Sequence, residues 1–298
     1  MFDLTPQLDC AGRVLKLDRP RVMGIVNVTP DSFSDGGHHD TVEAAVAHGL
    51  KLAAEGADLL DVGGESTRPG ADAVSLEDEL ARVIPVIERL ARETSLPISV
   101  DTSKPEVMRA AVAAGAGMIN DVYALRREGA LDAAASLGVP VVLMHMLGEP
   151  RGMQDAPQYD DVVGDVHRFL AERLFACEMA GIPKKNLVVD PGFGFGKTLD
   201  HNLLLLRQLA RLTDLGVPVL AGISRKRSLG DITGRAVDER VSASVAAAVL
   251  AAEYGARLVR VHDVAATVDA MKVWAAVAAF PAPKAVAAKP SIRWPDDE

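Results

Sequence analysis

The stretch PISVDTSKPEVMRAAVAAGAGMIND, residues 97–121, contains the pattern on which the fold depends. Its ends, 97–102 and 117–121, are short runs rich in β-branched or apolar residues, and 104–115 between them carries apolar residues at helical spacing. Two strands joined through a helix pair in parallel by a right-handed crossover. The stretch therefore predicts one strand, helix, strand unit of a parallel sheet.

The same unit recurs along the chain. Eight strands are predicted, at 23–28, 58–63, 97–102, 117–121, 140–145, 187–191, 218–223 and 258–262. Each is followed by a predicted helix, at 41–55, 75–93, 104–115, 129–137, 160–181, 199–213, 238–255 and 265–279. Ser75 with Asp78, and Ser103 with Glu106, have the spacing of capping boxes at two helix starts.

Eight such units close into a barrel of about 250 residues, which is nearly all of this 298-residue chain. We therefore predict an α/β protein whose residues 21–280 form a single-domain (β/α)8 TIM barrel. Residues 1–20 are expected to form a hairpin-like segment that caps the barrel bottom, and residues 281–298 a flexible, disordered tail. A doubly wound open sheet is the alternative architecture.

Composition narrows the class of partner. Hydrophobic residues make up 49% of the chain and aromatic residues 4%, which indicates an aliphatic core. The formal net charge of -9 works against nucleic acid or an anionic membrane as partner and leaves small molecules. Signal-peptide features and membrane-length apolar runs are not found, and Cys10 and Cys177 have no metal-ligand spacing. These features predict a cytoplasmic protein with reduced cysteines.

Polar side chains end at least seven of the eight predicted strands. They are Asn27, Asp61, Asp101, Asn120, Asp121, His145, Asp190, Ser224, Lys226, Arg260 and His262. The alternative is that these residues are helix caps, since Asp, Asn and Ser commonly start helices after strands. The carboxyl ends of barrel strands meet at one face, however, so the whole ring predicts an active site there.

Three loops at that face carry further signals. The sequence DPGFGFGKT at 190–198 matches neither a P-loop nor a dinucleotide fingerprint, and its glycines are expected to let backbone approach a flat ligand. Phe193 or Phe195 could pack on that ligand or simply fill the core. The long loops 29–40 and 63–75 are predicted lids, with surface insertions as the alternative.

Eight segments together resemble the dihydropteroate synthases of folate biosynthesis, in order and over about residues 22–271. They are MGIVNVTPDSFSDGG (23–37), DVGGESTRPG (61–70), SVDTSKPEV (99–107), MINDV (118–122), VLMHM (142–146), DPGFGFGK (190–197), GISRK (222–226) and RVHDV (260–264). The resemblance implies a transferase that joins 7,8-dihydropterin-6-ylmethyl diphosphate to 4-aminobenzoate, giving 7,8-dihydropteroate and diphosphate. It also implies Mg²⁺ as cofactor, a homodimer, and binding of sulfonamides as 4-aminobenzoate mimics.

The chemistry of the substrates assigns roles to these residues. A carboxylate can accept both N–H groups of the pterin edge, which suits Asp190. An SN1-like departure of diphosphate leaves a delocalised cation, so Asp101 and Asp190 are expected to stabilise it electrostatically. With Lys226 and Arg260 they form the predicted catalytic set. The predicted pterin site comprises Asp101, Asn120, Met144, Asp190, Phe195 and Lys226.

The other two ligands take residues that the resemblance implies. The predicted diphosphate site comprises Asn27, Arg68, Arg260 and His262, with Asn27 as the Mg²⁺ ligand. The predicted aminobenzoate site comprises Phe33, Thr67, Arg68, Pro69 and Ser224. No general base is nominated, because a neutral aniline nitrogen is already nucleophilic, and His145 is expected to be a rim histidine with its hydrogen bonds satisfied.

Two other functions remain open at this stage. A methyltransferase that uses methyltetrahydrofolate and a corrinoid partner shares pterin recognition, but needs neither the 29–40 loop nor a diphosphate site. A noncatalytic pterin-binding barrel is the third hypothesis. The stretch SASVAAAVLAA at 242–252 could form the homodimer face or be buried within the barrel.

Overall fold

The computed structural model describes residues 6–28, 38–65, 74–148 and 157–281. Eight parallel strands form one sheet in the order β8-β7-β6-β5-β4-β3-β10-β9. The strands are β3 (Arg21–Asn27), β4 (Leu59–Gly63), β5 (Ile98–Asp101), β6 (Met118–Asp121), β7 (Val141–Met144), β8 (Leu187–Asp190), β9 (Leu220–Ala221) and β10 (Leu258–Val261). A parallel bridge between Val189 and Val219 joins β8 to β9. The sheet is thereby closed, and the predicted TIM barrel is confirmed.

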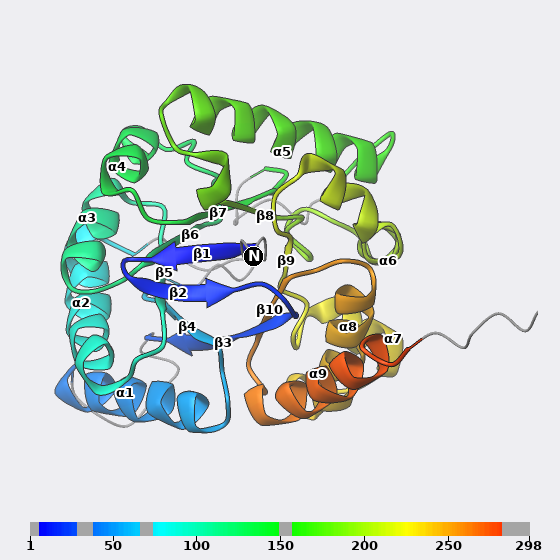
Figure 1. Ribbon diagram of the computed structural model, residues 1–298, viewed down its shortest axis with the longest axis horizontal. Coiled ribbons are helices and arrows are strands. Elements are labelled where there is room, and N and C mark those ends of the chain that lie inside the picture. Colours follow the sequence, from blue (N-terminus) through cyan, green and yellow to red (C-terminus); the bar gives the residue numbers. More distant parts are fainter. Residues whose placement is uncertain (1–5, 29–37, 66–73, 149–156, 282–298) are drawn as a thin grey trace, which may run out of the picture.

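Helices surround the ring of strands on the outside (Figure 1). They are α1 (His38–Ala54), α2 (Leu76–Glu93), α3 (Pro105–Ala113), α4 (Ala130–Leu137), α5 (Val162–Met179), α6 (Leu199–Arg207), α7 (Arg227–Thr233), α8 (Val241–Glu253) and α9 (Val264–Ala278). The predicted helix 199–213 is in fact α6 followed by a 3-10 helix, Leu209–Leu215, and α7 was not predicted. None of the described helices is long and apolar enough to cross a membrane.

The two predicted helix caps have different outcomes. Ser75 accepts a hydrogen bond from the Asp78 backbone N–H at 3.0 Å, as a cap should. The prediction for Ser103 is wrong. Its hydroxyl donates to Asp121, and α3 begins after Lys104 with Pro105 in the first turn, without a side-chain cap.

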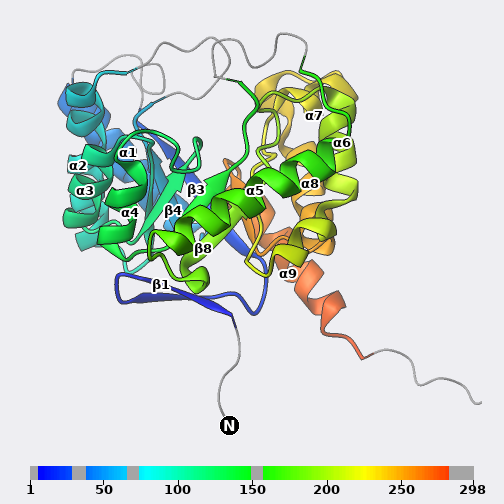
Figure 2. The same cartoon turned by 90° about the horizontal axis from the view of Figure 1, so that it is seen from above.

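Residues 7–16 form a hairpin of β1 (Gln7–Cys10) and β2 (Arg13–Lys16). Its turn residues Ala11 and Gly12 have φ of 53° and 86°, the left-handed pair that a tight hairpin turn uses. A Cβ atom on Gly117, beside the start of β6, would lie 2.4 Å from the Cys10 carbonyl oxygen, so the hairpin packs directly on the barrel. The buried contacts are apolar and involve Leu8, Cys10, Leu15 and Leu17 with Met23, Leu59, Met118, Val142, Val188, Leu220 and Leu258. The hairpin covers the end of the barrel where these strands begin (Figure 2).

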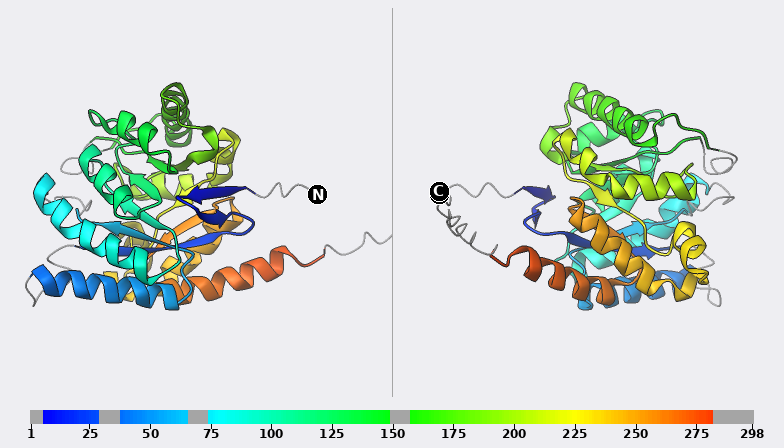
Figure 3. Two further views of the ribbon diagram at one scale, coloured as in Figure 1. Left: turned by 60° about the vertical axis from the view of Figure 1, so that its left-hand side comes forward. Right: turned by 90° about the vertical axis from the view of Figure 1, so that its right-hand side faces the viewer.

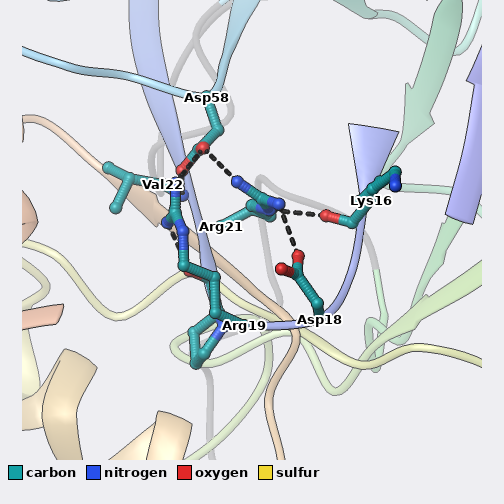
Figure 4. A network of polar contacts seen from close by, with 7 residues as sticks. Lys16, Asp18, Arg19, Arg21, Val22 and Asp58 are labelled. Atoms are coloured by element: carbon teal, nitrogen blue, oxygen red, sulfur yellow. Dashed lines mark hydrogen bonds and ion pairs between the residues drawn. The ribbon is translucent and has the colours of Figure 1, made fainter. Parts of the chain in front are cut away.

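Asp58, just before β4, anchors the chain at the same end (Figure 4). Its carboxylate accepts two hydrogen bonds from Arg19, at 2.6 and 3.1 Å, and one from Arg21 at 2.9 Å. It also accepts from the Val22 backbone N–H at 2.9 Å. This network fixes the segment that leads from the hairpin into β3, at the end of the barrel opposite the ring of polar strand ends.

Candidate active site

The carboxyl ends of the strands bring the predicted pterin residues to one face of the barrel. Asp101 and Asn120 are register partners on β5 and β6, and Met144 and Asp190 are register partners on β7 and β8. Asn120 pairs with Val142, two residues before Met144, so all four side chains point to the same side of the sheet, at the carboxyl ends of the strands. Four predicted aminobenzoate and diphosphate residues, Phe33, Thr67, Arg68 and Pro69, lie outside the described residues, as does most of both predicted lid loops.

Arg260 on β10 lies between two carboxylates. Its Nε is 2.6 Å from Asp61 Oδ2, and its Nη2 is 2.7 Å from Asp101 Oδ2. Burial opposes the charge of Arg260, but Asp61 and Asp101 outweigh it and raise the pKa of the guanidinium. Burial raises the pKa of Asp101, and the neighbouring Arg260 opposes that shift. Arg260 is therefore a fixed cation whose third nitrogen, Nη1, has no hydrogen-bond partner among the described residues.

Asp61 is the residue whose position sequence reasoning noted without giving it a role. It is fully buried in β4. Besides Arg260, its Oδ2 accepts a hydrogen bond from Asn120 Nδ2 at 3.1 Å. One buried carboxylate thus orients both a predicted diphosphate residue and a predicted pterin residue. The available signal was a carboxylate in mid-strand, where burial demands a charged or polar partner.

Asp190 and Lys226, two residues of the predicted pterin site, lie near enough for each charge to act on the pKa of the other. Burial raises the pKa of Asp190, opposed by the Gly192 N–H, which donates to it at 2.7 Å, and by Lys226. Burial lowers the pKa of Lys226 to about 8, opposed by Asp190. The Lys226 ammonium also lies 4.0 Å from the Phe195 ring centre, a cation–π contact.

Apolar side chains gather beside Asp190 and Lys226. Met144 and Phe195 are buried together with Val122 and Met146. Apolar side chains beside a buried carboxylate and a partly buried ammonium suit a flat heterocycle with a polar edge. The structure therefore brings Asp101, Asn120, Met144, Asp190, Phe195 and Lys226 to the same end of the barrel, and their role as a pterin site stays a prediction.

Lys197 is a second residue that the sequence analysis passed over, although it belongs to the glycine-rich loop. Its buried ammonium donates to the carbonyl oxygens of Gly192 and Phe195, both at 2.9 Å, and to that of His145 at 3.4 Å. It also lies 2.9 Å from His145 Nδ1. Burial lowers the pKa of Lys197 to about 7, opposed by Asp190. This lysine pins the loop that carries Phe195 against the end of β7.

His145 is held inside the same cluster. Burial, then Lys197 and Arg126, lower its pKa to about 2, so the imidazole is neutral at physiological pH. Its ring also packs edge-on against Phe169, with centroids 4.9 Å apart. One ring nitrogen, Nδ1, thus has a hydrogen-bond partner, and the full prediction of a satisfied rim histidine stays a prediction.

Ser224 and His262 lie together in the turns after β9 and β10. Ser224 Oγ is 3.1 Å from His262 Nδ1 and accepts from the His262 backbone N–H at 3.2 Å. The structure thus joins one predicted aminobenzoate residue to one predicted diphosphate residue. Asn27 stands at the end of β3, partly exposed, as the register partner of Gly63.

Comparison with known proteins identifies the family. A family model described as pterin binding enzyme matches residues 23–262. The dihydropteroate synthase of Escherichia coli K12 is 53% identical over 267 residues, which cover 90% of this chain and 95% of that protein. The chain belongs to the dihydropteroate synthase family.

Solved structures of dihydropteroate synthases have the same fold. One from Xanthomonas albilineans with 4-aminobenzoic acid is 72% identical, with a TM-score of 0.89 over 93% of this chain and all of that one. Another from the same organism, in complex with 7,8-dihydropteroate, is 69% identical, with a TM-score of 0.85 over the same shares. The family resemblance drawn from eight sequence segments is confirmed.

Proposed function

We propose that this member of the dihydropteroate synthase family condenses 7,8-dihydropterin-6-ylmethyl diphosphate with 4-aminobenzoate, giving 7,8-dihydropteroate and diphosphate. One observation carries the proposal. The buried Asp190 and Phe195 gather with Lys226 at the same end of the barrel as the fixed cation Arg260, which acts on the pKa of both charged groups. A pterin and a diphosphate on one substrate need this combination.

Asp190 would hold the pterin. Its carboxylate can accept the two adjacent N–H groups of the amino-pyrimidinone edge, and burial strengthens that pair. Asn120 is oriented by Asp61 and would reach the remaining ring nitrogens. Lys226 would donate to the carbonyl or a ring nitrogen while its stem lies along Phe195.

Arg260 and His262 would hold the leaving diphosphate, with Arg68 from the loop outside the described residues. The Asn27 amide oxygen is the kind of ligand that Mg²⁺ accepts, and the described residues hold no cluster of three acidic, histidine or cysteine side chains. That donor set fits a Mg²⁺ ion which takes its other ligands from diphosphate and water. Bound there, the ion would neutralise charge on the leaving group.

The reaction would be an SN1-like displacement. The bond between the methylene carbon and the diphosphate oxygen breaks, and its electron pair leaves with diphosphate. The pterin-stabilised cation then lies beside Asp101 and Asp190, whose positions are already fixed. The aniline nitrogen supplies the electron pair of the new C–N bond and releases its proton to solvent, so no protein base is needed.

Ser224 would bind the aminobenzoate carboxylate, together with Phe33, Thr67, Arg68 and Pro69 of the two loops. Sulfonamides, which mimic that ligand, are expected to compete for the same site. A methyltransferase that moves a methyl group from methyltetrahydrofolate has no use for Arg260 beside the pterin pocket. A noncatalytic barrel has no use for it either, so the synthase is favoured over both alternatives.

We also propose a homodimer through α7, α8 and α9, which lie side by side on the outside of the barrel (Figure 3). Large apolar side chains are exposed there, with Ile232 54%, Leu250 44% and Val273 65% exposed. The 242–252 stretch also buries Ala247, Ala248 and Ala251, so it serves core and surface together. Analytical ultracentrifugation should give a dimer for the chain and a monomer for L250E/V273E; a monomeric unaltered chain would contradict the proposal.

The proposed location is the cytoplasm. Cys10 and Cys177 are both free and buried, as expected for a protein of a reducing compartment. Fractionation of cells that make the chain should recover it with cytoplasmic markers; recovery with exported proteins would contradict this.

Calorimetric titration with 6-hydroxymethyl-7,8-dihydropterin, which has no leaving group, tests the pterin site. The variant D190N should bind at least about 100-fold more weakly, because an amide cannot accept from both pterin donors. The control D58N removes a partly buried carboxylate at the other end of the barrel and should bind as the unaltered chain does. Unchanged affinity in D190N would refute the assigned role.

A further inference from the structure

Arg225 stands between Ser224 and Lys226, two residues of the proposed site. Its φ of 58° is in the left-handed region, which residues with a Cβ atom rarely adopt unless the surrounding structure holds them there. Its backbone N–H donates to Ser244 Oγ at 2.9 Å, and its carbonyl oxygen accepts from Arg240 Nη1 at 3.0 Å. Both anchors come from the region of α8, so the turn after β9 is held from the outside of the barrel.

The side chain of Arg225 joins this turn to the next one. Its Nε lies 3.0 Å from Asp263 Oδ2, and its Nη2 lies 2.5 Å from Asp263 Oδ1, a two-pronged pair. Asp263 directly follows His262 and precedes α9 without capping it by its side chain. The Arg225–Asp263 ion pair therefore joins the same two turns that the Ser224–His262 contact joins.

We propose that Arg225 and Asp263 are positioning residues for the aminobenzoate half of the site. This inference rests on the proposed function. The pair fixes the left-handed turn, and the turn fixes the direction of Ser224. Two hydrogen bonds to both carboxylate oxygens fix the orientation of the planar guanidinium, whereas one hydrogen bond would let it rotate.

Most of the pterin half of the site is anchored elsewhere. Lys226 follows Arg225 in the same turn, but its ammonium is also held outside that turn, by the Phe195 ring and the charge of Asp190. Asp101, Asn120 and Asp190 stand on β5, β6 and β8, and Arg260 is held by Asp61 and Asp101. None of these contacts involves Arg225 or Asp263. Loss of the pair should therefore weaken the use of aminobenzoate far more than the use of the pterin diphosphate.

A double-mutant cycle tests the proposal, with R225M, D263N and the variant that combines them. Each single variant should raise the KM for 4-aminobenzoate about tenfold, since small misplacements of a binding group cost this much or more. The KM for the pterin diphosphate should change less than about threefold. The combined variant should match the single variants, because each removes the same pair.

The chain offers a matched control pair. Arg19 and Asp58 form a two-pronged ion pair of similar exposure at the opposite end of the barrel, with side chains 41% and 10% exposed against 32% and 14% for Arg225 and Asp263. The variants R19M and D58N should lower the unfolding temperature and leave both KM values unchanged. An aminobenzoate KM raised equally in the control variants would show a general loss of stability and overturn the proposal.

Two further outcomes would also overturn it. If R225M raises the aminobenzoate KM and D263N does not, Arg225 acts on the substrate by itself. If the effects of the two substitutions multiply, the residues do not act through each other. Amide hydrogen exchange keeps the test independent of turnover: exchange at residues 223–226 should speed up in both R225M and D263N. Unchanged exchange refutes positioning even if the proposed reaction itself fails.

Discussion

The Lys226 ammonium lies 4.0 Å from the centre of the Phe195 ring, and the buried Asp190 is near enough to act on the pKa of the lysine. Burial moves the pKa of the lysine down and that of the aspartate up. Burial thus disfavours the charged form of each residue, and the opposite charge of the other residue stabilises it. Their protonation should therefore control substrate binding.

The first prediction follows from the lysine. With a pKa of about 8, Lys226 is protonated below pH 8 and loses its positive charge as the pH rises through that value. The kcat/KM for the pterin diphosphate should therefore fall as the pH rises, with a midpoint near pH 8. In K226R the residual activity should show no such fall, because arginine stays protonated. A flat profile between pH 7 and 9.5 in the unaltered chain would contradict the assignment.

The second prediction compares two glycines of nearly identical φ. Gly192 has φ of 68° and Gly138 of 67°, but a Cβ on Gly192 would lie 1.9 Å from the His145 carbonyl oxygen, whereas a Cβ on Gly138 would meet nothing within 4 Å. G138A should cost about 1–2 kcal/mol, the left-handed strain alone. G192A should cost about 2–3 kcal/mol more and weaken pterin binding. Urea unfolding of both variants measures the difference, and equal losses would argue against a packed loop.

The third prediction concerns the lysine inside that loop. K197M keeps the length of the side chain but leaves the Gly192 and Phe195 carbonyl oxygens without their donor. It should lower the free energy of unfolding by about 3 kcal/mol and raise the pterin KM about tenfold. The exposed Lys185 supplies the control, and K185M should change neither quantity. A normal pterin KM in K197M would mean that the loop needs no such anchor.

The fourth prediction concerns the order of binding. If aminobenzoate enters a slot completed over bound diphosphate, it should bind weakly to the free chain and at least about tenfold more tightly with Mg²⁺ and diphosphate present. Chelation of Mg²⁺ should remove the gain. Calorimetry under the three conditions provides the measurement, and equal affinities would contradict an ordered site.

Much of the fold was predictable because most strands are short apolar runs and most helices carry apolar residues at helical spacing. The exceptions are local. The 3-10 helix Leu209–Leu215 continues the apolar spacing of α6, so pattern alone did not separate them. The seven-residue helix α7 is too short to show a period. The role of Ser103 depends on the buried Asp121, eighteen residues further along.

The candidate site divides in the same way. Asp101, Asn120 and Asp190 were predictable because polar side chains at the carboxyl ends of barrel strands meet at one face. Asp61, Lys197 and the Arg225–Asp263 pair were not assigned roles, because each has a partner in a distant segment. Arg260 lies 199 residues from Asp61, and Lys197 reaches back 52 residues to His145. Spacing along the chain gives no measure of such contacts.

The most direct test of the proposed function is turnover followed by mass spectrometry. The purified chain is incubated with 7,8-dihydropterin-6-ylmethyl diphosphate, 4-aminobenzoate and Mg²⁺, and the amounts of the products are measured over time. We predict 7,8-dihydropteroate and diphosphate in equal amounts, with formation suppressed by a sulfonamide and nearly abolished in D190N. Pterin bound without any dihydropteroate formed, or methyl transfer from methyltetrahydrofolate to a corrinoid instead, would contradict the account.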